Sequence, residues 1–100
     1  MKLKAAFIFL APEADFTKDM ATINTAEVEL TTVGVKNYDD AVEAAKTLEK
    51  KGITAIELCG GFGIEGVAKI KQSVSNKIPV GVVRFDYHPG LNNQSGDNLF

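Results

Sequence analysis

Hydrophobic positions along the chain fall into two recurring patterns. Short runs that are almost continuously apolar, or rich in Val and Thr, occupy residues 5–11, 28–35, 53–59 and 80–87. Runs of this length and composition are typical of strands in a parallel sheet that is covered on both faces. The segments between them repeat apolar residues every three or four positions, and this spacing predicts helices.

Three helices are expected between the four strands. The best defined begins after Asn37, a preferred capping residue, and ends before Gly52, a preferred terminator. Its apolar stripe consists of Tyr38, Ala41, Val42, Ala45 and Leu48. A second helix is expected over residues 15–23, with Asp15 as its cap, and a third over residues 64–76. The apolar face of the third would carry Ile64, Val67, Ile70 and Val74.

Strands that alternate with helices predict a parallel sheet with right-handed crossovers. The expected fold is one α/β domain over residues 1–87, a three-layer sandwich around a four-stranded parallel sheet in flavodoxin-like order 2-1-3-4. The alternative is half of a (βα)8 barrel, completed by a second copy of the chain. The residues expected in the core include Phe7, Phe9, Ile56, Leu58 and Val82.

The tail, residues 88–100, departs from both patterns. It consists of turn-forming residues without periodicity, followed by the apolar pair Leu99 and Phe100. Apolar residues in such a segment predict docking, either on the body of the domain or on a neighbouring subunit. A homo-oligomer is therefore one of the expected partners.

Composition narrows the range of functions. The 100 residues carry a net charge of −2, and no stretch concentrates Lys or Arg, which argues against nucleic-acid and acidic-membrane partners. The single cysteine excludes an internal disulfide and fits a cytoplasmic protein. The basic start followed by AAFIFLA imitates a signal peptide, but Pro12 and Glu13 interrupt it, and we interpret the run as a strand.

A glycine cluster follows the third strand. Gly60, Gly61 and Gly63 lead into the third helix, and Gly61 to Gly66 reads G-x-G-x-x-G. In open α/β sheets, ligands bind beyond the carboxyl ends of the strands, and the first N–H groups of a helix favour anions. Asp86 lies twenty residues after Gly66, as in a dinucleotide fingerprint, but only one strand follows, which favours a smaller anion.

Two charged residues interrupt strands that are otherwise apolar. Glu57 and Arg84 each lie about two residues before the end of the third and fourth strands, which are expected to be neighbours. A charge in a buried strand is unusual unless it is paired. The pair is either a self-satisfied buried ion pair, or a site where Arg84 holds an anion and Glu57 orients its guanidinium.

Two further residues could carry chemistry. Cys59 ends its strand beside the glycine N–H groups and is a candidate nucleophile or proton-transfer group, although a lone cysteine in an apolar run is also a common core residue. His88, the only histidine, is a candidate general acid or base, or a turn-stabilising residue. Cys59, Asp86 and His88 match no zinc spacing, so no metal site is expected, and no cofactor can be named.

Two resemblances bear on function. Through AIELCGGFG, VGVVRFDYHPG and nearly all of its length, the chain resembles a family of short bacterial proteins, about 100 residues long, without an assigned function. From Gly52 to Val83 it is locally similar to the second half-domain of aspartate/glutamate and hydantoin racemases, in which a strand ends in a catalytic cysteine. That resemblance implies proton transfer by Cys59. Those enzymes use two cysteines, however, and a symmetric dimer would have to supply the second.

Together these patterns predict a small soluble α/β protein that binds a small anionic molecule at the glycine cluster. A cysteine-dependent racemase or isomerase and a non-catalytic assembly protein are the two alternatives, and whether the protein is an enzyme stays open.

Overall fold

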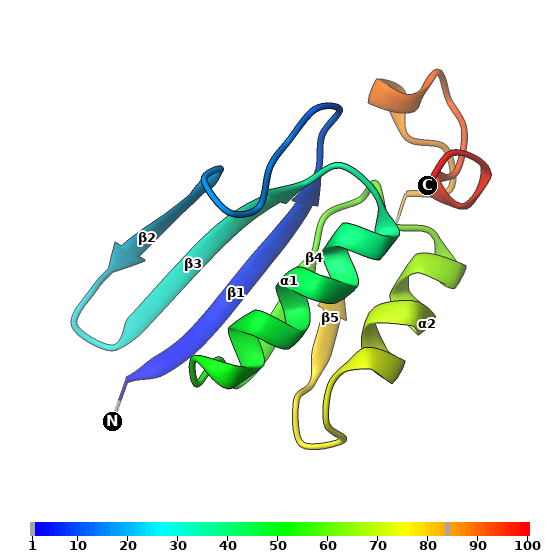
Figure 1. Ribbon diagram of the computed structural model, residues 1–100. Coiled ribbons are helices and arrows are strands. Elements are labelled where there is room, and N and C mark those ends of the chain that lie inside the picture. The colour runs from blue at the N-terminus through cyan, green and yellow to red at the C-terminus, as the bar shows by residue number, and fades with distance from the viewer. Residues whose placement is uncertain (1, 84) are drawn as a thin grey trace.

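The computed structural model describes residues 2–83 and 85–100. Within them the chain forms β1 (Leu3–Leu10), β2 (Met20–Asn24), β3 (Val28–Val35), α1 (Tyr38–Lys50), β4 (Ala55–Leu58), α2 (Ile64–Ser73), β5 (Val80–Val82) and two short 3-10 turns, η1 (Pro89–Leu91) and η2 (Gly96–Asn98). The strands make one sheet in the order β2-β3-β1-β4-β5 (Figure 1). β3, β1, β4 and β5 are parallel to one another, whereas β2 runs antiparallel to β3.

This mixed sheet corrects the predicted fold. The four-stranded, all-parallel, three-layer sandwich is wrong, because a fifth, antiparallel strand joins the sheet and α1 and α2 both lie on the same face (Figure 1). The half-barrel alternative is wrong too. In a (βα)8 barrel, neighbouring strands follow one another along the chain, whereas β1 lies here between β3 and β4.

The segment expected as a helix over residues 15–23 is a loop followed by β2 (Figure 1). Asp15 Oδ1 accepts the hydroxyl and the N–H of Thr17 at 2.6 and 2.9 Å, and the N–H of Asp15 donates to Asp19 Oδ2 at 2.7 Å. The Thr17 hydroxyl and then its N–H hold the pKa of Asp15 below the ordinary value. Such local bonds compete with helix formation, and pairing with β3 favours a strand over Met20–Asn24.

The missing helix decides which face of the sheet is covered. The connection from β1 to β3 runs toward one edge of the sheet. The connections from β3 to β4 and from β4 to β5 run toward the opposite edge. A right-handed crossover helix on that first step would lie on the face opposite α1 and α2. The loop and β2 take its place, so no helix among the described residues covers that face (Figure 1).

The hydrophobic core lies between the covered face and the two helices. Its largest fully buried side chains are Phe62, Ile8, Ile56, Leu58, Ile70, Val33 and Val35. Phe7 and Phe9 have the opposite parity along β1 and are only half-buried, and Val82 is 46% exposed on the short edge strand β5. The prediction that these three residues would be buried is therefore wrong.

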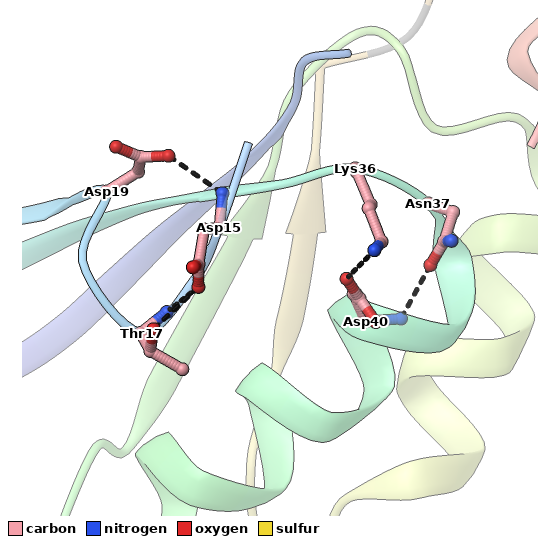
Figure 2. Close-up of polar contacts among 6 residues, drawn as sticks. All are labelled: Asp15, Thr17, Asp19, Lys36, Asn37 and Asp40. Atoms are coloured by element: carbon pink, nitrogen blue, oxygen red, sulfur yellow. Dashed lines mark hydrogen bonds and ion pairs between the residues drawn. The ribbon is translucent and has the colours of Figure 1, made fainter. Parts of the chain in front are cut away.

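Local signals set the bounds of α1. The side chain of Asn37 caps the helix by accepting the N–H of Asp40 at 2.8 Å, and Lys36 lies 4.0 Å from the Asp40 carboxylate (Figure 2). After the helix Gly52 adopts a positive φ of 96°, which a glycine tolerates best. The helical face of α2 is less regular than expected, since Ile64 is 66% exposed.

The structure also bears on membrane insertion. Neither α1 nor α2 combines the length and the apolar character that a membrane-crossing helix requires, and the described ranges contain no other α-helix.

Candidate functional site

The start of α2 lacks a capping side chain of its own. Its N-cap residue is Gly63, which makes no side-chain hydrogen bond. The next residues along the helix therefore present backbone N–H groups that need an acceptor from elsewhere, and a helix N-terminus carries partial positive charge. This is the position that the sequence predicts as an anion site.

A carboxylate from the tail occupies this position. Asp97 Oδ1 accepts the N–H of Glu65 at 3.1 Å and the N–H of Gly66 at 3.3 Å. These are the N2 and N3 positions of α2, whose N–H groups an N-cap side chain normally satisfies. Asp97 thus caps a helix that begins 33 positions earlier in the sequence, at Ile64.

Tyr38 joins the first turn of α1 to the same carboxylate. Its hydroxyl donates to Asp97 Oδ1 at 3.1 Å and accepts the N–H of Gly63 at 3.0 Å. The ring is 3% exposed, and it stacks on Phe62 at 5.5 Å and tilts against Phe100 at 6.0 Å. Burial raises the pKa of the Tyr38 hydroxyl to about 12, an effect that the Gly63 N–H opposes and the Asp97 carboxylate reinforces.

The tail is folded so that it presents Asp97. Ser95 Oγ accepts the N–H of Asp97 at 3.2 Å and so caps η2. The carbonyl of Gly96 then accepts the N–H groups of Leu99 and Phe100 at 3.0 and 2.9 Å. This compact turn directs the carboxylate toward α2 and the Phe100 ring toward Tyr38.

The glycines of the cluster provide space for neighbouring groups. A Cβ on Gly60 would lie 2.1 Å from the Phe85 ring, one on Gly63 would lie 2.1 Å from the Asp97 carboxyl carbon, and one on Gly66 would lie 2.4 Å from the Tyr38 ring. A Cβ on Gly96 would lie 1.7 Å from the carbonyl oxygen of Gly61. Among the described glycines only Gly52 has a positive φ, so close packing, and not left-handed backbone, accounts for this cluster.

The family model whose description is "Family of unknown function (DUF6506)" matches residues 3–98, a range that contains both the glycine cluster and Asp97. The chain belongs to the DUF6506 family. No curated protein and no solved structure matches it, so no comparison supports the likeness to racemases that the sequence suggests. Membership of DUF6506 assigns no activity.

Cys59 lies where β4 meets the glycine cluster and is half-buried. Its sulfur accepts the N–H of Gly61 at 3.3 Å and the N–H of Leu10 at 3.4 Å. The thiol therefore ties the end of β1 to the glycine turn. It also packs against the core, as a small apolar residue would.

The ring of Phe85 connects His88 to the glycine cluster. Phe85 fills the space above Gly60, and the rings of Phe85 and His88 meet edge to face at 4.9 Å. His88 Nδ1 accepts the N–H of Gly90 at 2.9 Å and thereby caps η1, which is the turn-stabilising alternative. Asp86 lies between β5 and η1 and is exposed.

Of the predicted charge pair, the structure describes only Glu57. Glu57 is exposed on the uncovered face of the sheet, so the premise that it is buried and requires a partner is wrong. Arg84 lies outside the described residues. The role expected for Arg84 as an anion ligand stays a prediction.

Sequence reasoning missed Tyr38 and Asp97 as site residues. Tyr38 looks like one more member of an apolar stripe, and Asp97 lies in a segment without periodicity. One signal was available: α2 opens with a glycine where a capping side chain is expected, which calls for an acceptor from elsewhere in the chain.

Other hollows lie away from this position. A groove of about 300 Å³ runs beside the C-terminal half of α1 and is lined by Phe16, Met20, Leu48 and Lys51 among others, whereas the Asp97 site lies at the N-terminal end of α1. Within the described ranges no three His, Cys, Asp or Glu side chains gather as they would around a metal ion.

Proposed function

We propose that this protein binds a small anion of the carboxylate or phosphate class at the start of α2, in exchange with Asp97. The observation that carries the proposal is the Asp97 carboxylate, which lies on the N–H groups of Glu65 and Gly66 and on the Tyr38 hydroxyl. These three donors suit an oxyanion, and the partial charge of the helix start adds to their effect.

The tail is a competitor for the incoming anion. Because Asp97 is tethered to the domain, its effective concentration at the site is on the order of millimolar. A free anion therefore binds the intact protein only weakly, unless it makes contacts that Asp97 does not make. Binding would release η2 and expose the Phe100 ring that packs on Tyr38.

Two substitutions of Asp97 separate ligand binding from capping. Asp97→Ala removes the occupant, whereas Asp97→Asn keeps a side-chain oxygen at the helix start without the charge. We expect phosphate or acetate to shift the amide resonances of Glu65 and Gly66 at lower concentration in Asp97→Ala than in Asp97→Asn or the wild type. Asp39→Ala, which removes a carboxylate from the first turn of α1, is the control for net charge.

Two outcomes would contradict the proposal. If neither anion shifts these amide resonances in Asp97→Ala, the start of α2 is only a capping position for the tail. If both anions act equally on all four proteins, they bind elsewhere.

Cysteine-dependent proton transfer is the second candidate. It is favoured by one observation, the two backbone N–H groups of Leu10 and Gly61 that point at the Cys59 sulfur. His88 is the general acid or base that the sequence suggests, but its Nδ1 accepts the N–H of Gly90. Thiol labelling, described in the Discussion, tests this candidate.

A further inference from the structure

The uncovered face of the sheet is continuous and almost entirely apolar. Register places on this face Leu3, Phe7 and Phe9 of β1, Ile23 of β2, Leu30 of β3 and Glu57 of β4. Leu3 and Ile23 are 47% and 62% exposed. Among the described strand positions of this face, Glu57 carries the only charge.

A sheet needs a second layer on its apolar face, and the chain supplies little of one. Where Gly34 pairs with Phe9, Ala14 of the loop after β1 approaches the sheet and covers that end of the face. The rest has no covering element among the described residues, because the β1-to-β3 connection contains a strand and not a helix. Two-layer packing is the general solution for an amphipathic sheet.

We infer that the uncovered face is a self-association surface, on which a second copy of this chain packs sheet against sheet. This inference does not depend on the anion site, which lies at the other side of the sheet among α1, α2 and the tail.

The size of the face agrees with this occupant. Strands about 4.8 Å apart with a rise of about 3.3 Å per residue give the five strands roughly 450 Å² of flat area, and side-chain relief raises the accessible area above that figure. Two such faces together have roughly 900 Å² of flat area, close to the roughly 1,000 Å² of a specific interface, and side-chain relief adds to it. Apolar patches of several hundred Å² on a monomer are often interaction surfaces.

The position of Glu57 favours a two-fold axis that runs along β1. Rotation about such an axis places β4 of one copy opposite β3 of the other, so the two Glu57 carboxylates are about 10 Å apart across the interface. An axis across the strands would instead place β4 against β4, with like charges closer together. The apolar side chains of β1 then lie at the centre of the interface, and β3 of each copy faces β4 of the other.

Substitution of residues that the monomer leaves exposed tests the inference without disturbing the core. By light scattering after size exclusion, we expect the wild type to have twice the 10.7 kDa mass of the chain. Ile23→Lys and Leu3→Lys should each halve that mass. Ile64→Lys is the matched control, since Ile64 is as exposed as Ile23, at 66% and 62%, but lies on α2.

Circular dichroism of each variant would confirm that it is folded. A wild type that is monomeric at about 100 µM, well above the dissociation constants of stable dimers, would overturn the inference. So would a dimer that survives both Ile23→Lys and Leu3→Lys, or one that Ile64→Lys dissociates. A monomer that instead binds lipid vesicles or a detergent through this face would show that a second copy is the wrong occupant.

Discussion

The Tyr38 hydroxyl lies 3.1 Å from the Asp97 carboxylate, although 59 positions separate these residues in the sequence. The contact joins the first residue of α1 to the tail, and both residues also bond to the backbone at the start of α2. The glycine cluster, α1 and the tail therefore form one packed unit. A substitution in any one of these three parts should therefore alter the packing of the other two.

Removal of the Tyr38 hydroxyl should destabilise the fold. Tyr38→Phe keeps the ring contacts with Phe62 and Phe100 but leaves the buried N–H of Gly63 without its acceptor. We expect the free energy of unfolding in urea to fall by about 1–3 kcal/mol. Tyr87→Phe is the control, because Tyr87 is 72% exposed and should change stability by less than about 0.5 kcal/mol.

A double-mutant cycle measures the contact itself. Tyr38→Phe and Asp97→Ala should be coupled by about 0.5–3 kcal/mol, since the two groups share a hydrogen bond and an environment. Strict additivity would mean that the hydroxyl and the carboxylate do not interact in solution.

Alkaline pH should weaken the fold through Tyr38. Its pKa is raised from 10.0 to about 12, so the folded state retains the phenolic proton where the unfolded chain loses it. The contribution is fully present below pH 10 and is lost as pH rises toward 12, a change on the order of 2–3 kcal/mol. Urea unfolding between pH 8 and about 11 should show the decline, and Tyr38→Phe should remove this part of it.

The titration can also be followed directly. In Tyr87→Phe, Tyr38 is the only tyrosine, so absorbance near 295 nm reports its ionisation alone. A midpoint near 10 in the folded protein would contradict the buried, carboxylate-paired environment.

A side chain added where the tail meets the glycine cluster should displace the tail. In Gly96→Ala the new Cβ would meet the Gly61 carbonyl oxygen at 1.7 Å, a backbone atom that cannot move aside easily. We expect the amides of Glu65 and Gly66 to lose hydrogen-exchange protection by about tenfold or more, because Asp97 leaves them. The core amides of β1 should keep theirs.

Gly81→Ala is the matched control for this experiment. A Cβ at Gly81 would find its nearest neighbour at 3.8 Å, an ordinary contact distance. Equal effects of the two substitutions on Glu65 and Gly66 would show that general destabilisation, and not the tail, is responsible.

The chemistry of Cys59 can be examined by alkylation. The sulfur is half-buried and accepts two backbone N–H groups, so we expect iodoacetamide to label the folded protein more slowly than free cysteine. Labelling in urea should be complete. A folded protein that reacts faster than free cysteine would favour the proton-transfer candidate.

Local signals located some elements and could not locate others. The Asn37 cap and the Val- and Thr-rich run at Val28–Val35 predict α1 and β3, since both depend on nearby residues. Residues 20–24 form a strand because β3 lies beside them, and the spacing of Phe16, Met20 and Ile23 contains no trace of that partner. The prediction of a sheet covered on both faces depended on this single misassignment, because the expected helix would have covered the second face.

The candidate site was likewise predictable only where it depends on neighbouring residues in the sequence. The glycine cluster is visible in the sequence, and its position after a strand and before a helix is correct. What fills it is not visible, because Asp97 reaches it through tertiary folding and not through a motif. The glycines resemble a phosphate-binding turn, but in this fold they leave room for the side chains of Phe85, Asp97 and Tyr38.

The contact between Gly63 and Asp97 has a consequence for the inheritance of these positions. A Cβ at Gly63 would lie 2.1 Å from the Asp97 carboxyl carbon, so the acid in this position requires a glycine at 63. Relatives in DUF6506 that lack the acid should be free to replace the glycine, and a Ser or Asp there would cap α2 from within. Those that retain the acid should keep the glycine. Joint variation at 63 and 97 among relatives would therefore show that the tail and the start of α2 are inherited as one unit.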